Sequence, residues 1–186
     1  MSAGRALEEL ILHIIENVEK KLREAEFFLD KMSEHEPLAF RDKEPFEFYL
    51  SAFLNAGRTV DYRLRHEHAA IYPGWRTGWD ATLTQAERDL IEFMINERND
   101  EVHESGSGHN VKTENRELGP GTHSFADGTV TIAGPVGGPL AFRPVLAYYF
   151  TIDGTERKAT EACKEYLALL RQMVATFKAE LMLRSI

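Results

Sequence analysis

The stretch from Leu7 to Met32, LEELILHIIENVEKKLREAEFFLDKM, decides the fold. Its apolar side chains recur at steps of three or four, which is the spacing of one face of an α-helix. The residues of this stripe are Leu7, Ile11, Ile14, Val18, Leu22, Ala25, Leu29 and Met32. Glu and Lys fill the opposite face, so we predict a long amphipathic helix over about residues 3–32. Pro37 ends it, because the residue before a proline avoids helical geometry.

Three more helices are predicted from the same pattern. The second begins at Pro45, which suits the first turn of a helix, and its small residues at 52, 56 and 57 allow another helix to approach closely. The segment 72–79 reads as a loop from its Pro and Gly content. The third helix opens with a capping box at 84–87 and runs to about residue 104. The fourth spans about 155–183. The apolar face of the second helix comprises Phe46, Tyr49, Leu50, Phe53, Gly57, Val60 and Leu64, and that of the last comprises Ala159, Ala162, Tyr166, Leu170, Met173, Val174, Phe177 and Leu181.

The region 109–153 differs from the helices on either side because it is rich in glycine. Asp127-Gly128 is typical of a tight hairpin turn within 125–130. The segment from Leu146 to Ile152 is aromatic and β-branched, so it is predicted to be a strand. The glycines at 134–138 lack the Gly-Lys-Ser/Thr ending of a phosphate-binding loop. We therefore predict a small β-hairpin insertion, and Gly154 reads as the signal that starts the last helix.

Together these elements predict a mainly all-α protein, a four-helix up-down bundle with a β insertion between the third and fourth long helices. The chain has 186 residues, 43% of them hydrophobic. That is enough for one core, so residues 1–186 are predicted to form a single domain that contains the insertion at 109–153.

Charge and cysteine content narrow the class of protein. The 22 basic and 30 acidic residues give a net charge of −8, which argues against a general nucleic-acid coat, a DNA-binding protein or a basic membrane binder. The single cysteine, Cys163, excludes an internal disulfide and reads as a small core residue. Early glutamates interrupt any signal-peptide core, and no stretch is apolar enough for a membrane span. We expect a soluble cytoplasmic protein.

The best chemical signal lies late in the third helix, in NERNDEVH at residues 96–103. Asn99 and His103 are one turn apart and about 40° from each other around the helix axis, whereas Arg98 and His103 are about 140° apart, a gap that the long arginine stem can partly close. Histidine can transfer a proton near neutral pH, and arginine offers a fork of donors to a phosphate. This set suits phosphodiester chemistry without a metal. The structural alternative is that these residues only cap or pair near a helix end.

An Arg-Asn pair followed by three residues and His, late in a helix of a helical bundle, resembles the HEPN family. The segment FEFYLSAFLNAGRTV at 46–60 also resembles the helix that precedes this motif in one bacterial branch of the family. The likeness covers about residues 1–104 and 155–183 and leaves out the β insertion.

The resemblance implies a bundle that forms two-fold homodimers, with two copies of the motif lining a shared cleft. It implies a metal-independent endoribonuclease in which His103 handles the proton of the ribose 2′-hydroxyl or of the leaving 5′-oxygen, Arg98 stabilises phosphate charge and Asn99 supports the site. The expected products are a 2′,3′-cyclic phosphate and a 5′-hydroxyl. Many members are toxins or defence effectors, so a cognate antitoxin is an expected partner. Other members are non-catalytic, and a protein- or nucleotide-binding module is the alternative function.

Other residues suggest chemistry less strongly. The imidazoles of His66 and His68 would point about 200° apart on a helix, so one metal ion could not take both. Two Glu-x-x-His motifs, which a di-iron bundle needs, are absent from the sequence. We therefore expect no metal and no cofactor. Trp75 and Trp79 with Arg76 between them either stack a base or, as we favour, pack over the end of the bundle. The arginines at 63 and 65 form either a basic patch near the cleft or, as we favour, a solvated face.

Overall fold

The computed structural model describes the backbone of residues 3–36, 42–103, 110–118, 121–125, 128–132 and 141–184. It describes side chains only within residues 15–36, 42–97, 110–114 and 146–184. The described residues form five helices: α1 (Ala3–His35), α2 (Glu44–Glu67), α3 (Tyr72–Thr82), α4 (Gln85–His103) and α5 (Ala159–Arg184). Five strands lie between α4 and α5: β1 (Asn110–Leu118), β2 (Gly121–Phe125), β3 (Gly128–Ile132), β4 (Ala141–Ile152) and β5 (Thr155–Lys158). The prediction of a mainly helical chain with a small β insertion is confirmed.

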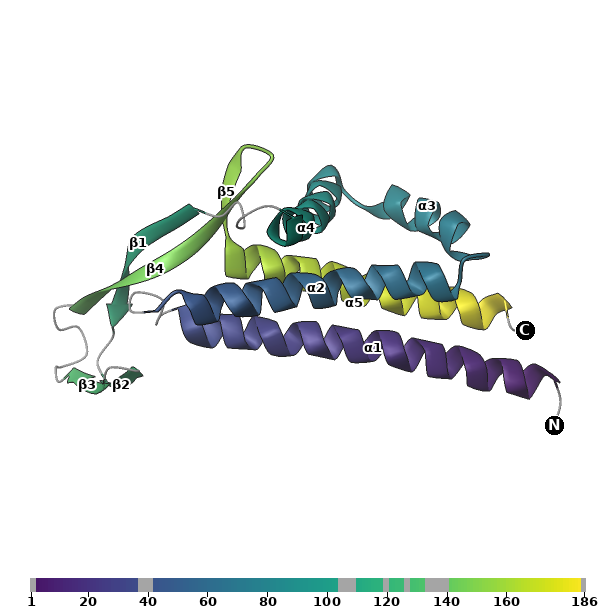
Figure 1. The fold of residues 1–186 in the computed structure, drawn as a ribbon, viewed down its shortest axis with the longest axis horizontal. Coiled ribbons are helices and arrows are strands. Elements are labelled where there is room, and N and C mark those ends of the chain that lie inside the picture. Colours follow the sequence, from purple (N-terminus) through teal and green to yellow (C-terminus); the bar gives the residue numbers. More distant parts are fainter. Residues whose placement is uncertain are drawn as a thin grey trace.

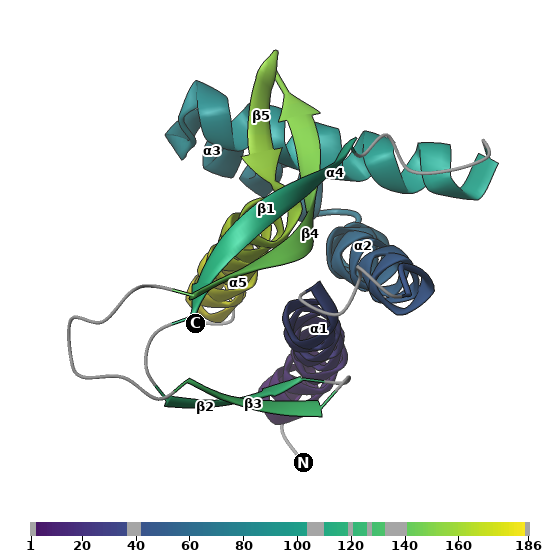
Figure 2. The same ribbon diagram turned by 90° about the vertical axis from the view of Figure 1, so that its left-hand side faces the viewer.

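Three long helices, α1, α2 and α5, run side by side along the long axis of the molecule (Figure 1). The fourth long helix, α4, crosses above α2 and α5 and is seen nearly end-on in Figure 1, whereas Figure 2 shows it extending sideways beyond α2. The described helices therefore form two layers, α1, α2 and α5 below and α3 with α4 above. The prediction of a four-helix up-down bundle is therefore not confirmed, because α4 crosses the other three long helices instead of running alongside them.

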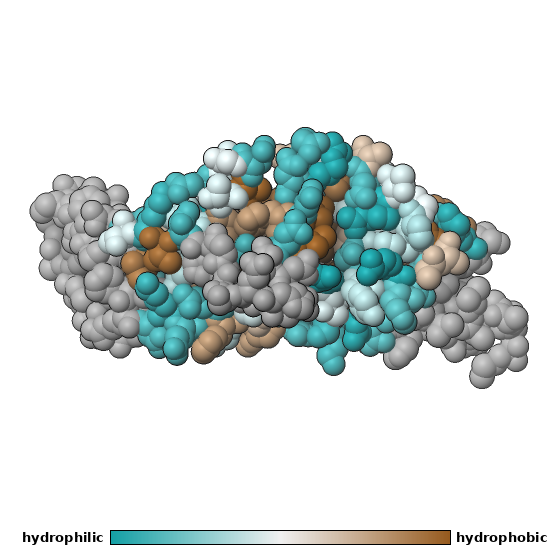
Figure 3. Space-filling view, turned by 45° about the horizontal axis from the view of Figure 1, so that its top comes forward, coloured by the Kyte–Doolittle hydropathy of each residue, from teal (hydrophilic) through white to brown (hydrophobic). Residues whose placement is uncertain are grey.

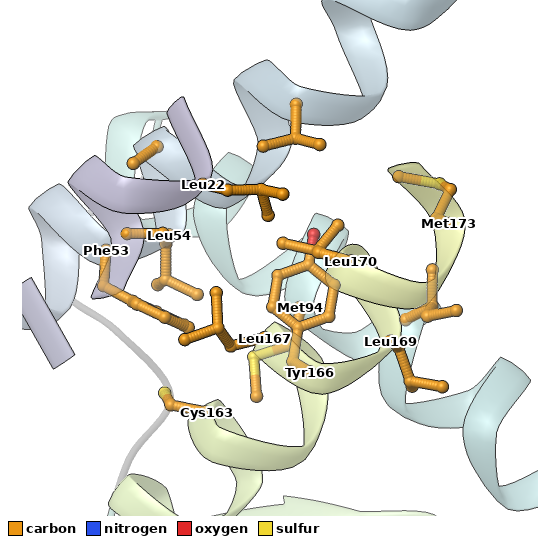
Figure 4. Close-up of a cluster of buried hydrophobic side chains, with 14 of the residues drawn as sticks. Leu22, Phe53, Leu54, Met94, Cys163, Tyr166, Leu167, Leu169, Leu170 and Met173 are labelled. Atoms are coloured by element: carbon orange, nitrogen blue, oxygen red, sulfur yellow. The ribbon is translucent and has the colours of Figure 1, made fainter. Parts of the chain in front are cut away.

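The predicted stripes of the long helices form the core. Five members of the first stripe are buried, namely Val18, Leu22, Ala25, Leu29 and Met32, while the first three lie among side chains that are not described. All eight predicted core residues of α5 are buried. Figure 4 shows where these surfaces meet: Leu22 of α1, Phe53 and Leu54 of α2 and Met94 of α4 surround a row of α5 side chains.

The close helix approach predicted at the small residues of α2 is confirmed at Gly57. A Cβ built on this glycine would lie 2.8 Å from Cε1 of Tyr166 and 3.3 Å from Cδ1 of Leu170, both on α5. The ring of Tyr166 is itself buried and stands edge-on to Phe53, with ring centroids 6.2 Å apart. Only a residue without a Cβ fits at this crossing without a shift of its neighbours.

The segment predicted as a loop, residues 72–79, is instead the helix α3. Pro73 occupies the first turn, where its missing N–H costs nothing. Arg76 and Asp80 pair at a spacing of four, with 2.7 Å between Nε and Oδ1. A Cβ added at either glycine, Gly74 or Gly78, would meet no atom within 4 Å, so these glycines neither assist packing nor prevent it.

A three-stranded antiparallel sheet in the order β1-β4-β5 extends from one end of the helices (Figures 1 and 2). The predicted strand 146–152 is confirmed as the second half of β4, where Tyr148 and Phe150 are buried. Tyr148 stacks on Phe46 of α2 with ring centroids 3.9 Å apart, and Phe150 lies 5.0 Å from Phe93 of α4. These contacts attach the sheet to the helical layers.

The start of the last helix is corrected by the structure. Gly154 does not begin a helix; with Asp153 it forms the turn between β4 and β5, and both have positive φ, 71° and 47°. Such angles are those of a tight hairpin turn. The helix α5 therefore begins at Ala159, four residues later than predicted.

The other predicted hairpin is confirmed as β2 and β3, whose last pair is Phe125 with Gly128. Within the residues described, no helix combines the length and apolarity needed to cross a membrane.

Candidate functional site

The helix that carries the predicted motif is firmly attached over its first half. Its capping box is formed: the Thr84 N–H donates to the Glu87 carboxylate at 2.7 Å, and the Glu87 N–H donates to the Thr84 hydroxyl at 3.3 Å. The backbone hydrogen bond also lowers the pKa of Glu87. Leu90, Ile91 and Met94 are buried against the other helices. These contacts fix the start and the direction of α4.

The three predicted catalytic residues, Arg98, Asn99 and His103, all lie within α4, which continues without a break to His103. The helix rises about 1.5 Å per residue, so their backbones span about 7.5 Å along its axis. Their side chains lie outside the part that the structure describes. The structure therefore brings the three positions together on one helix.

Glu97 precedes the motif and is buried, with 4% of its surface exposed. It follows Leu90 and Met94 at steps of four and three, so it continues the apolar row that α4 turns toward the core. Its charge also acts on α5: burial raises the pKa of the Cys163 thiol, and the negative charge of Glu97 adds to that effect. Cys163 is fully buried, as predicted for a core residue. The carboxylate of Glu97 thus belongs to the interior of the protein.

A polar network that the sequence did not predict joins α2 to α3. Asp61 of α2 accepts hydrogen bonds from the Tyr72 hydroxyl and from Nη1 of Arg76. Arg76 also donates to the Tyr72 oxygen at 2.8 Å and to Asp80 at 2.7 Å, and it lies over the Trp79 ring at 5.1 Å. Burial, with Asp61 adding to it, raises the pKa of Tyr72. These hydrogen bonds hold α3 against α2.

A small cavity lies beside this network, lined by Asp61, Arg76, Trp79, Tyr166 and the aliphatic side chains of α4 and α5. Its volume is about 10 Å³, which is at most the space of one water molecule. Nε1 of Trp79 is buried and has no hydrogen-bond partner among the side chains and backbone that the structure describes. A cavity of this size cannot admit a substrate, and the network fixes α3 against α2 and α5 instead.

The two tryptophans of α3 pack over the helices. Their rings stack with centroids 6.0 Å apart, and Trp75 also stands edge-on to Phe177 of α5 at 4.7 Å. Trp79 is 5% exposed. This arrangement confirms the packing interpretation that was favoured over base stacking, and Arg76 between them is engaged by Asp61 and Asp80.

The histidines at the end of α2 have different surroundings. His66 is exposed and stacks on Tyr62, with centroids 5.8 Å apart. His68 follows the end of the helix beside Phe177, where burial lowers its pKa. Within the described part of the chain, its Nε2 has no hydrogen-bond partner. Among the residues described, no group of three or more side chains could hold a metal ion. Arg65 is exposed over Tyr62, whereas Arg63 reaches the Asn17 carbonyl at 3.4 Å.

Two open grooves lie along α5. One, of about 670 Å³, runs between α3 and the end of α5, and its Glu180 and Arg184 pair at 2.7 Å. The other, of about 440 Å³, lies between the start of α4 and α5, and its Arg157 and Glu165 also pair. The face drawn in Figure 3 is mostly hydrophilic, with separate hydrophobic patches. These charged side chains along both grooves thus already have partners in the chain.

The chain was compared with models of known protein families, with curated proteins and with solved structures, and none of the three comparisons gives a match.

Proposed function

We propose that the protein is a HEPN-like, metal-independent endoribonuclease that cleaves RNA through the ribose 2′-hydroxyl, with Arg98, Asn99 and His103 as its catalytic residues. The observation that carries this proposal is the continuity of α4 from Gln85 to His103. It keeps the three residues within about one and a half turns of a single helix. Because the first half of that helix is capped and buried, the motif belongs to a supported element, as a catalytic constellation requires.

The proposal assigns α1, α2, α4 and α5 to a HEPN-like four-helix bundle. In a homodimer of such bundles, the motifs of two copies would line one cleft. The half of α4 that carries the motif continues beyond α2, away from the three-helix layer (Figure 2). This is the part of the helix that a second copy and an RNA strand could approach together.

In the proposed reaction, the imidazole of His103 takes the proton of the ribose 2′-hydroxyl, or gives a proton to the leaving 5′-oxygen. The 2′-oxygen attacks the adjacent phosphorus, the bond to the 5′-oxygen breaks, and a 2′,3′-cyclic phosphate and a 5′-hydroxyl result. Arg98 stabilises the charge that develops on the phosphate oxygens, and Asn99 orients either group or binds a phosphate oxygen. A toxin or defence effector with a cognate antitoxin is the biological role that fits such an activity.

The test is cleavage of end-labelled single-stranded and structured RNA in the presence of EDTA, with analysis of the product ends. Arg98→Ala and His103→Ala should each lower the cleavage rate by about 10²–10⁴-fold. His66→Ala and Arg65→Ala are matched controls, because both side chains are exposed and distant in sequence from the motif. Equal activity in the wild type and in both motif variants would refute the assignment of the site.

A non-catalytic binding module is the second candidate function, and the net charge of −8 favours it because an acidic protein attracts RNA weakly. If no variant and no wild-type preparation cleaves RNA, this candidate replaces the first. Titration calorimetry with mononucleotides and with RNA, on the wild type and on Arg98→Ala, would then show whether the same segment binds a ligand.

A further inference from the structure

Among the strands that the structure describes, β1 has a neighbour along only one of its two hydrogen-bonding edges. It is nine residues long, and all nine pair with β4, from Asn110 opposite Tyr149 to Leu118 opposite Ala141. Among the described strands, none pairs with its other edge. The opposite edge of the sheet is β5, which has only four residues. A long free edge presents a row of N–H and C=O groups that can pair with another extended segment.

The charges on β1 lie in an ordered pattern along this edge. Lys112 and Glu114 are two residues apart, so they share one face of the sheet. Both side chains are partly exposed, 47% for Lys112 and 36% for Glu114. Inside the chain, Lys112 contacts Glu156, and Glu114 contacts Lys158 at 3.3 Å and the Tyr149 hydroxyl. Because each side chain is partly exposed, a second partner can also contact it.

This pattern selects the register in which two copies of β1 can pair antiparallel. With Thr113 opposite itself, Lys112 of each copy faces Glu114 of the other, and Asn110 faces the arginine at 116. With Glu114 opposite itself, like charges meet, because two carboxylates are paired and Lys112 faces that arginine. With Asn115 opposite itself, Glu114 faces the arginine at 116, but Lys112 faces Leu118. The first and third registers therefore both pair opposite charges, and they differ in the charge left over. The first places the arginine opposite the amide of Asn110, whereas the third places Lys112 opposite an aliphatic side chain, so the first register is favoured.

We propose that β1 is a self-association edge, on which a second copy of this chain pairs antiparallel about Thr113 to give a continuous six-stranded sheet. The occupant is a second copy because the charges of the edge are complementary to themselves under a two-fold axis. Such an interface is closed, since each copy contributes the same residues to it. The inference does not rest on the proposed ribonuclease activity.

The experiment is sedimentation velocity on the full chain over a range of micromolar concentrations, comparing the wild type with Lys112→Glu and Glu114→Lys. Each variant places like charges at two symmetric positions, so we expect a weakening of the dimer by about tenfold or more. An equimolar mixture of the two variants should restore the dimer, because the introduced glutamate of one chain then faces the introduced lysine of the other. The unchanged Lys112 of the second chain faces the unchanged Glu114 of the first. With one variant uniformly labelled with ¹⁵N, native mass spectrometry distinguishes this mixed dimer from either homodimer by mass.

Controls separate this interface from a general effect of charge or folding. Lys20→Glu and Glu92→Lys change the net charge by the same amounts at exposed helical positions and should leave the dimer unchanged. Far-ultraviolet circular dichroism checks that every variant is folded. The proposal is overturned if the wild type is monomeric throughout, if Lys112→Glu sediments like the wild type at every concentration, or if the mixed variants sediment no faster than each variant alone while both are folded.

Discussion

Replacement of Gly57 by alanine tests the closest helix contact in the core. Alanine in the middle of a helix favours folding by about 1 kcal/mol over glycine when nothing opposes it. At Gly57, however, the new methyl group would lie 2.8 Å from Cε1 of Tyr166 and 3.3 Å from Cδ1 of Leu170. Overfilling a packed core typically costs about 1–3 kcal/mol. The tyrosine ring is buried and held by Phe53, so it cannot move aside cheaply.

The two effects leave a net loss of about 1 kcal/mol for Gly57→Ala, which lowers the midpoint of thermal unfolding by about 2–4 °C. The matched control is Gly78→Ala in α3, where no atom lies within 4 Å of the new methyl group. That substitution should raise stability, because only the helix propensity changes. Urea unfolding followed by circular dichroism measures the free energies, and the two substitutions should have opposite signs.

A double-mutant cycle identifies the contact that is responsible. Tyr166→Leu removes the ring atom that the new methyl group would meet, so Gly57→Ala should be less harmful in that background. A coupling energy near zero would show that the tyrosine ring does not oppose the methyl group. Stabilisation of the otherwise wild-type protein by Gly57→Ala would refute the packing argument altogether.

Three further predictions concern polar groups that are partly or fully buried. Asp61→Asn should destabilise the protein by about 2 kcal/mol, because it removes the charge that faces Arg76, while the exposed Glu161→Gln should change the urea midpoint little. Burial raises the pKa of Glu36 in the folded protein above its ordinary value of 4.5. The protonated carboxyl group therefore contributes to stability at low pH, and this contribution is lost as the pH rises from 4.5 through the raised pKa of the folded state. Stability measured against pH should therefore fall more steeply over that window in the wild type than in Glu36→Gln. Cys163 should react with a thiol reagent in the native protein only as fast as the protein opens, and at once in urea, because it is fully buried with a raised pKa.

The long helices could be predicted from the sequence because their signal is local. Val18, Leu22, Ala25, Leu29 and Met32 recur at steps of three or four, and all of them are buried. The capping box at the start of α4 and the hairpin formed by β2 and β3 are also set by neighbours within a few residues. In each case the pattern comes from residues that are only a few positions apart in the sequence.

The helix α3 could not be predicted in this way because its support is distant in sequence. Arg76 pairs with Asp61, fifteen positions earlier, and Trp75 packs on Phe177, about a hundred positions later. Locally, the glycines and the proline of this segment favour a loop. In α3, tertiary contacts outweighed local preference. At Gly154 the local signal was itself ambiguous, because a glycine that is predicted to start a helix also suits the turn of a hairpin.

The sequence predicted that the candidate site residues share one helix, but it did not predict how that helix lies against the others. The sequence put Arg98, Asn99 and His103 on one helix, and α4 confirms that much. Its crossing over α2 and α5 depends on contacts with residues far away in the sequence, such as Phe93 of α4 against Phe150 of β4. No periodicity within α4 contains that information.

At Glu97, residue spacing and residue charge give opposite predictions. Its spacing from Leu90 and Met94 predicts that it lies on the buried row of α4, whereas its charge predicts the solvent-exposed face. The structure resolves this conflict in favour of spacing, since only 4% of Glu97 is exposed. Glu97 is also the last side chain of α4 that the structure describes, and the motif follows it directly on the same helix. The turn from which the motif starts is therefore supported by the core of the protein.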